Sequence, residues 1–399
     1  MAYVKKEIFA KRLKLKLYRE LKQSGFKISL KEIRPPDLSN KNALRRAHRT
    51  AKEHLLIKNK EWILENRRTL KEKFADGNDI QPTEIYPELK LIDTQEEADL
   101  FRYASYLWSV PLSNGFGRRL RYLVLDKSND KLIGLIGLTD PVIGLGVRDK
   151  WIGWSKEQKE KMLWHVMDAY TFGAIPPYSH LLCGKLVATL MTSNEVRRDF
   201  KEKYSHGRTE ISHKNYSERG ADLVLLTTTG AFGESSILDR LQTLEGIAKG
   251  GSRKKRLLWE HIGFTEGWGF FHLNNGVATD TFDYLKAIKD PIVEAHKFGE
   301  GPNWKMRLIN RGLRRLGIDY QKYNKHGVKR GFYISPLAKN YKAFLNGQNK
   351  KPQYYNQNID DLFGFFKERY LLPRSERNFE WKKFNFNVYN HKMVGSYLN

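Results

Sequence analysis

Hydrophobic positions near the N-terminus recur at helical spacing. Residues 5–23 form one such run, and residues 41–75 contain two more that are dense in Arg and Lys. A link with two prolines follows. The pattern predicts a basic, mainly helical N-terminal arm or domain over residues 1–90. The apolar positions of the first run are Ile8, Leu13, Leu15, Leu17 and Leu21.

Strand-like runs begin after residue 118. The segments RLRYLVLD, KSND and KLIGLIGL predict a β-hairpin over residues 119–138, because two β-rich runs flank a turn that carries Asn and Asp. A helix is predicted from Ser155 to Tyr170, with Ser155 as its N-cap and Gln158 completing a capping box. A short strand is expected at residues 170–175.

Two prolines end this strand and open the next helix. The remaining expected elements are a helix His180–Met191, a strand Asp222–Thr228, a tight turn Gly230–Gly233, a helix Ser235–Leu244, a helix Trp304–Leu316, a strand Gly331–Ser335 and a helix Tyr341–Leu345. Strands and helices therefore mix along the chain, which predicts an α/β protein of the mixed α+β kind.

The charge is distributed unevenly. The net charge is +26, and residues 1–75 hold 22 Lys and Arg against 8 Asp and Glu, while residues 301–399 hold 20 against 6. The intervening residues 76–300 are almost neutral, with 29 against 31. Basic segments of this kind bind phosphate backbones, because neutralised phosphates release condensed counterions. Nucleic acid is the expected partner; an anionic membrane surface and a merely solvated surface are the alternatives.

The chain carries no signal for a membrane or for an oxidising compartment. No run approaches the roughly 18 apolar residues of a spanning helix. The basic N-terminus contains Glu7 and Glu20 and lacks an apolar core and a cleavage site, so it is read as part of the fold. Cys183 is the only cysteine, so an internal disulfide is excluded. We interpret Cys183 as a small core residue. A cytoplasmic location is expected.

The segment AIPPYSHLLCGKLVATLM places a helix directly after a strand. A free helix N-terminus offers backbone N–H groups to a phosphate, and GNAT-type N-acetyltransferases hold acyl-coenzyme A in this way after their fourth strand. The segment keeps only the final Gly of the GNAT signature, and an ordinary strand–helix junction is the alternative. The similarity predicts a GNAT-like mixed-sheet core over residues 91–300, followed by a basic α/β region over 301–399. The candidate coenzyme-binding residues are Ser179, His180, Leu182, Gly184 and Lys185.

A second glycine turn lies in TTTGAFGESS, residues 227–236. Hydroxyl groups and backbone amides at this strand end suit a phosphate or a base, although Ser235 could instead cap a helix. Scattered acidic residues allow a metal-dependent nuclease, but structural carboxylates are the competing interpretation, and no metal-ligand spacing is present, so no bound metal is expected. The candidate catalytic carboxylates are Asp140, Asp149, Glu234 and Glu266.

Several basic residues lie beside aromatic ones, an arrangement that can stack on bases while contacting the backbone. The candidate nucleic-acid-binding residues are Arg45, Arg46, Arg118, Arg119, Arg121, Lys254, Lys255, Arg307, Arg311, Arg314, Arg315, Lys329, Arg330, Lys382 and Lys383. DNA is expected in preference to RNA.

Several segments in order resemble the DruA family, which is named for the Druantia anti-phage defence system. They include WSVPLSNGFGRRLRYLVLD, RDKWIGW, LLTTTGAFGESS, GPNWKMRLINRGLRRLG and HGVKRGFYISPLAKNYKAFLNG, and the resemblance runs from near residue 10 to near residue 385. It implies a prokaryotic, phage or mobile-element protein of a defence system that acts beside a helicase-like partner. It implies no catalytic residue.

Three hypotheses follow. The first is a nucleic-acid-binding defence component that engages DNA through its basic terminal segments. The second is a GNAT-type transferase that acts on nucleic acid or a bound protein, with acyl-coenzyme A at residues 179–185. The third is a metal-dependent enzyme that cleaves or joins DNA strands and uses Asp140, Asp149 or Glu266. Whether the chain is an enzyme is left open at this point.

Overall fold

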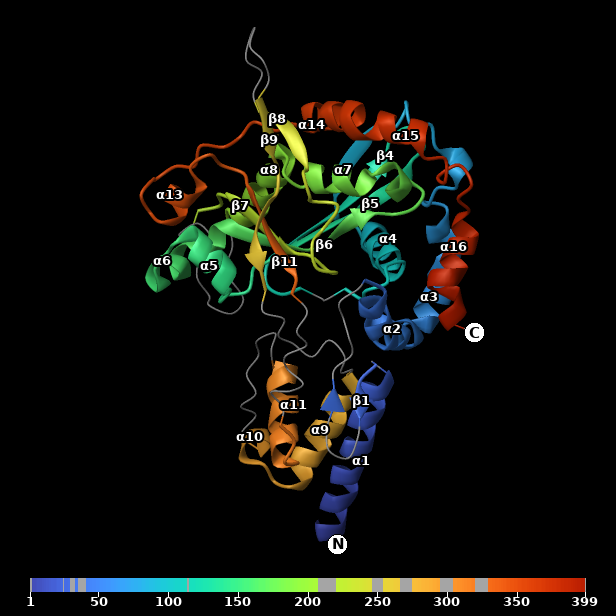
Figure 1. Ribbon diagram of the computed structural model, residues 1–399, viewed down its shortest axis with the longest axis vertical. Helices are drawn as coiled ribbons and strands as arrows, with labels where there is room; N and C mark the ends of the chain where they lie inside the picture. The colour runs from blue at the N-terminus through green and yellow to red at the C-terminus, as the bar shows by residue number, and fades with distance from the viewer. Residues whose placement is uncertain are drawn as a thin grey trace.

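The computed structural model describes residues 2–23, 25–28, 33–34, 41–112, 115–206, 220–245, 254–265, 275–294, 304–319 and 329–398. Figure 1 shows these residues as two bodies: a larger one built around a sheet, called the sheet body, and a smaller one of helices, called the helical body. The chain enters the helical body first and returns to it at residues 275–319, so each body combines segments that are distant in sequence.

The sheet body contains a seven-stranded sheet in the order β10-β11-β7-β6-β5-β4-β3. Its strands are β3 (Pro87–Leu91), β4 (Arg119–Asp126), β5 (Lys131–Thr139), β6 (Val166–Ala174), β7 (Leu225–Thr229), β10 (Glu260–Phe264) and β11 (Gly331–Pro336). Strands β3 to β6 are antiparallel neighbours in chain order. A short turn joins β4 to β5, whereas α4 (Gln95–Tyr106) lies between β3 and β4, and α5 (Gly146–Ile152) and α6 (Lys156–Met162) lie between β5 and β6. Strands β6 and β7 are parallel. Strand β11 lies between β7 and β10 and is antiparallel to both.

Strands β6 and β7 part soon after they begin. Backbone pairing joins Val166–Asp168 to Leu225–Thr227 and then stops, although β6 continues to Ala174. On its other side β6 stays paired to β5 along its length, with a register shift at Tyr170. The edge of β6 that faces β7 is therefore freed from backbone pairing beyond Asp168.

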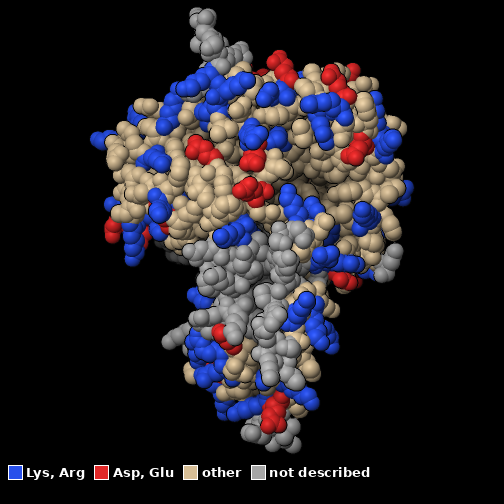
Figure 2. Space-filling view, in the orientation of Figure 1, with Lys and Arg blue, Asp and Glu red and all other residues tan. Residues whose placement is uncertain are grey.

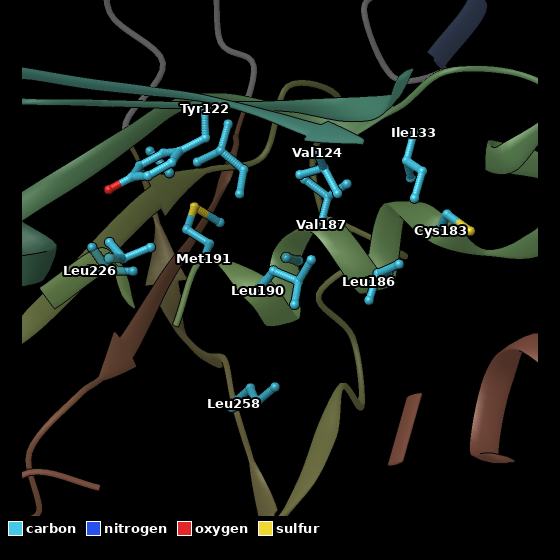
Figure 3. Packing of buried hydrophobic residues seen from close by; sticks show 14 of the residues in the cluster. Tyr122, Val124, Ile133, Cys183, Leu186, Val187, Leu190, Met191, Leu226 and Leu258 are labelled. Carbon is cyan, nitrogen blue, oxygen red and sulfur yellow. The ribbon is translucent and has the colours of Figure 1, made fainter. Parts of the chain in front are cut away.

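Helices cover both faces of the sheet. On one face, α7 (Cys183–Leu190) packs Leu186, Val187 and Leu190 against Tyr122 and Val124 of β4, as Figure 3 shows. Leu123, which lies between these two strand residues, joins a core on the opposite face, as the two-residue period of a strand requires. The helices of the opposite core include α3 (Lys60–Lys71), α4 (Gln95–Tyr106) and α16 (Phe386–Met393). The other helices of the sheet body are α2 (Lys41–Lys58), α5 (Gly146–Ile152), α6 (Lys156–Met162), α8 (Asn194–Tyr204), α13 (Tyr341–Leu345), α14 (Ile359–Phe366) and α15 (Leu372–Arg377), and a small hairpin pairs β8 (Gln242–Glu245) with β9 (Lys254–Leu257).

The helical body has its own core. It comprises α1 (Ala2–Gln23), the short pair β1 (Lys27–Ile28) and β2 (Ile33–Arg34), α9 (Asn275–Ala287), α10 (Pro291–Glu294) and α11 (Trp304–Arg315). Leu13, Leu17 and Leu21 of α1 are fully buried against α9 and α11. They are three of the five apolar positions that the sequence places at helical spacing. The other two, Ile8 and Leu15, are each 58% exposed, so the buried face of α1 is narrower than predicted.

The mixed α/β class predicted from the sequence is confirmed, and two local predictions are wrong. The helix expected at Ser155–Tyr170 ends at Met162, and residues from Val166 onward form β6. The helix expected at Ser235–Leu244 is a series of turns followed by β8. The division into domains at residues 90 and 300 remains a prediction. The core of the helical body contains residues from all three predicted domains.

Within the described ranges, no helix is long and apolar enough to cross a membrane.

Candidate functional site

A cavity of about 840 Å³ opens in the sheet body where β6 and β7 separate. This volume is in the range of sites that bind small ligands. We call it the central cavity. Its walls are mainly apolar and aromatic, with several hydroxyl and basic groups. Its lining residues include Lys41, His48, Trp108–Leu112, Ala169–Ala174, Ser179, Leu182, Gly184, Lys185, Thr228–Phe232, Glu234–Leu238 and Arg330.

One wall is the connection between β6 and α7. Four of the five predicted coenzyme-binding residues line the cavity, and the exception is His180, which lies beside Phe384 and Glu380. Leu182 has a φ of 62° and forms the N-cap of α7 without a side-chain cap. Lys185 points its ammonium group to the backbone oxygens of Ile237 and Asp239, each at 2.9 Å. This lysine therefore ties the two walls together.

The opposite wall begins at the end of β7. Thr228 donates its hydroxyl to the backbone oxygen of Ala169 at 2.8 Å, and the chain then turns through Gly230–Gly233. The hydroxyl of Ser235 accepts a long, weak hydrogen bond of 3.4 Å from the backbone N–H of Leu238. It therefore caps a turn, and no helix follows at residues 236–240. The two segments singled out from the sequence, AIPPYSHLLCGK and TTTGAFGESS, thus meet across one cavity.

A basic residue next to β11, Arg330, also lines the cavity. It lies directly before the strand, and burial lowers the pKa of its guanidinium group. Its Nε atom is buried and donates to no acceptor among the residues that the structure describes. The guanidinium of Arg45 on α2 lies 5.1 Å from the ring centre of Phe232, which lines the cavity.

The candidate catalytic carboxylates do not come together. Asp140 accepts from the guanidinium of Arg118 at 2.8 Å. Burial would raise the pKa of Asp149, but hydrogen bonds from Lys159 and Arg148 outweigh it and lower that pKa. Both carboxylates are thereby engaged in structural ion pairs.

Glu234 is exposed at the central cavity, and Glu266 lies outside the described residues. In the described part of the chain, no group of three His, Cys, Asp or Glu side chains could hold a metal ion.

Asp168 is a titratable group that the sequence analysis missed. Burial raises its pKa to about 6, and it accepts a 2.5 Å hydrogen bond from the hydroxyl of Thr227. The two residues form the last backbone pair before β6 and β7 part. An aspartate within the strand run VMDAYTFGA was the available signal. The first part of this run, up to Tyr170, was predicted to be the end of a helix, and only residues 170–175 were predicted to be a strand.

The helical body carries a concentrated positive charge. Its described residues hold 17 Lys and Arg against 7 Asp and Glu, and Figure 2 shows more blue than red side chains over this part of the molecule. On α11, Arg307 and Arg314 are exposed, whereas Arg311 and Arg315 donate to Asp290 at 3.1 and 2.8 Å. Two acidic residues, Asp290 and Asp280, thus help to hold the helices together without cancelling the charge.

Two of the predicted nucleic-acid-binding residues are placed differently: Arg330 lines the central cavity, and Arg118 is buried. Arg118 is buried between Trp164, 3.7 Å from the ring centre, and Asp140, so it holds the fold and is not available to a phosphate. This corrects the sequence-based prediction for that residue. The exposed members of the predicted set in the sheet body are Arg45, Arg46, Arg119, Lys254, Lys255, Lys329, Lys382 and Lys383, and Arg121 is partly buried over the ring of Phe101.

Comparisons with known proteins identify relatives by sequence. The family model described as Druantia protein DruA matches residues 38–347. The chain is also 36% identical over 373 residues to Druantia protein DruA of Escherichia coli (strain UMEA 4076-1), which covers 93% of this chain and 89% of that protein. No solved structure matches the chain.

Proposed function

The chain belongs to the DruA family of Druantia proteins, and from this premise we propose that it is a nucleic-acid-binding component of a prokaryotic anti-phage defence system. We place the nucleic-acid contact on the helical body. The resemblance also supports a helicase-like partner. A location in the cytoplasm is proposed from the single cysteine, which suits a reducing compartment.

The observation that carries the proposal is the surface of α11. Its apolar residues Leu308, Ile309 and Leu313 are buried in the helical body, so the basic residues must occupy the remaining faces. Arg307 and Arg314 are exposed at a spacing of two helical turns, which suits successive contacts to a phosphate backbone. Lys and Arg on α1 extend the same charge.

Binding to labelled duplex DNA, single-stranded DNA and RNA across a salt series tests this proposal. Phosphate contacts predict an affinity that falls steeply as salt rises, by about tenfold or more between 50 and 200 mM. DNA is the expected preference. Binding that is weak or insensitive to salt for all three would contradict the proposal and would point to a protein partner for the basic surface.

A second candidate function is transfer of an acyl group with acyl-coenzyme A held in the central cavity. It is supported by the convergence of Ser179, Leu182, Gly184 and Lys185 on that cavity. It is also supported by the place of α7, which follows β6, the fourth strand of the seven-stranded sheet in chain order. Coenzyme A would supply the activated acyl group, and the residues of this wall would hold its diphosphate.

Thermal stability in the presence of acetyl-coenzyme A tests the second candidate. A ligand that binds only the folded state raises the melting temperature, so no shift at millimolar coenzyme would count heavily against it. The third hypothesis, metal-dependent DNA cleavage, gains no support from the described residues, because Asp140 and Asp149 are committed to separate ion pairs.

A further inference from the structure

Arg330 is held firmly at the edge of the central cavity. Its backbone oxygen accepts from the N–H of Thr265 at 2.9 Å, which continues the pairing of β10 with β11. The next residue, Gly331, donates to Gly233 at 3.1 Å and accepts from Gly230 at 2.8 Å. The side chain therefore starts from a fixed point between the sheet and the glycine turn, and it lines the cavity.

The charge of Arg330 has no ion-pair partner among the residues that the structure describes. Burial also lowers the pKa of its guanidinium group. Burying a charge without a partner costs free energy. Two comparable guanidinium groups are paired: Arg118 with Asp140 and Arg148 with Asp149, at 2.8 and 2.7 Å.

The cavity around Arg330 has room for a ligand that could supply the missing anion. The ammonium-bearing Lys41 and the buried His48, both on α2, line the same cavity, while Glu234 is exposed to solvent. The rings of Trp108, Phe172 and Phe232 also line it. Aromatic faces of this kind stack on planar groups such as nucleobases.

We propose that the central cavity binds a small phosphorylated ligand of nucleotide size, with a phosphate group paired to Arg330. The guanidinium fork matches the geometry of phosphate oxygens and keeps its charge over the working pH range. The phosphate can come from a free nucleotide or from a coenzyme that carries a nucleotide. The inference does not depend on nucleic-acid binding by the helical body, and it holds whether or not a group is transferred.

The test measures binding of adenosine triphosphate and of coenzyme A to the full chain by calorimetry, with adenosine as the probe that lacks phosphate. The two phosphorylated probes distinguish the two sources. The variant is Arg330→Met, which keeps an unbranched side chain and removes the charge. Lys329→Met is the matched control, because it removes one positive charge at an exposed neighbouring position.

The wild-type protein and Lys329→Met are expected to bind at least one phosphorylated probe more tightly than adenosine. Arg330→Met is expected to lose about tenfold or more in affinity, as a lost charge-assisted hydrogen bond implies. Its melting temperature without ligand should be equal to or above that of the wild type, since the removed charge has no ion-pair partner among the described residues. Salt-dependent DNA binding should be unchanged in Arg330→Met, so failure here and failure of the proposed function are distinguishable.

Three results would overturn the inference. One is a wild-type protein that binds neither phosphorylated probe, or binds both no more tightly than adenosine. Another is Arg330→Met binding as tightly as the wild type. The last is an Arg330→Met protein whose melting temperature falls clearly below that of Lys329→Met, because Arg330 would then be a structural residue.

Discussion

The hydroxyl of Thr228 donates a 2.8 Å hydrogen bond to the backbone oxygen of Ala169, one position beyond the last backbone pair between β6 and β7. A side-chain hydrogen bond thus joins β6 and β7 directly after their backbone pairing ends. It satisfies a carbonyl group that the parting of the strands would leave unpaired in the interior. Both residues line the central cavity.

Thr228→Val is therefore expected to destabilise the protein. The substitution keeps the shape of the side chain and leaves the Ala169 oxygen without its donor, which costs about 1–3 kcal/mol. Urea unfolding followed by circular dichroism measures the change. Thr228→Ser keeps the hydroxyl and should lose clearly less, and equal losses in both variants would show that packing of the methyl group, not the hydrogen bond, is responsible.

Asp168→Asn is expected to stabilise the protein at neutral pH. Burial raises the pKa of Asp168 to about 6, above the value of about 3.9 in an unfolded chain. The folded state then binds more protons between these values, so this group makes stability fall as pH rises from about 4 to about 6. The variant should gain on the order of 1–3 kcal/mol above pH 6 and nothing below pH 4.

The measurement is the difference in unfolding free energy between the wild type and Asp168→Asn at pH 4, 5, 6 and 7.5. Glu376→Gln, which changes an exposed carboxyl group in the same way, is the control. A difference that stays constant across this range would refute the raised pKa of Asp168.

Lys52→Met is expected to stabilise the protein most at neutral pH. Lys52 is 4% exposed, and burial lowers its pKa to about 8. The unfolded chain then binds more protons between about 8 and about 10.4, so this group's cost is full below pH 8 and fades as pH rises towards 10.4. The gain, on the order of 1–3 kcal/mol at pH 7, should shrink in melting curves recorded up to pH 10. Lys58→Met, at an exposed position of the same helix, should show no such trend.

Removing the charges of Arg307 and Arg314 on α11 is expected to weaken nucleic-acid binding without unfolding the helix, because neither residue pairs with Asp290 as Arg311 and Arg315 do. In Arg307→Gln/Arg314→Gln, each lost phosphate contact should reduce the slope of log affinity against log salt by about 1. Lys350→Gln/Lys351→Gln removes the same charge from the sheet body. If both double variants change the slope equally, the contact is spread over the whole surface and the assignment to α11 fails.

Helices with a clear hydrophobic period were predicted well from the sequence. Segments in which a helix gives way to a strand, such as residues 155–174, were predicted poorly. Leu13, Leu17 and Leu21 reveal α1 because a whole face of that helix is buried. Around Ser155 the sequence contains a true helix start, with the backbone N–H of Gln158 bonded to the Ser155 hydroxyl. That signal says where a helix begins and not where it ends, and the pairing of β6 with two neighbouring strands overrides the helical pattern after Met162.

The candidate site was predicted in pieces. Both glycine-bearing segments were recognised, but their meeting across one cavity depends on the parallel pairing of β6 with β7, which joins residues about 60 positions apart. Arg330 was grouped with the nucleic-acid contacts because only its charge is visible in the sequence. Whether an arginine is paired, as Arg118 is with Asp140, is decided by tertiary contacts between residues 22 positions apart.

The way the helical body is assembled bears on how the protein is made. Helix α1 is synthesised before its partners α9 and α11, which follow only after about 250 further residues. At ~5–20 residues per second, the leucine face of α1 waits roughly 10–50 s on the ribosome before its partners exist. During that interval the segment is a basic helix with an uncovered apolar stripe, which makes it a target for chaperones, and a chain truncated before residue 275 would expose it permanently.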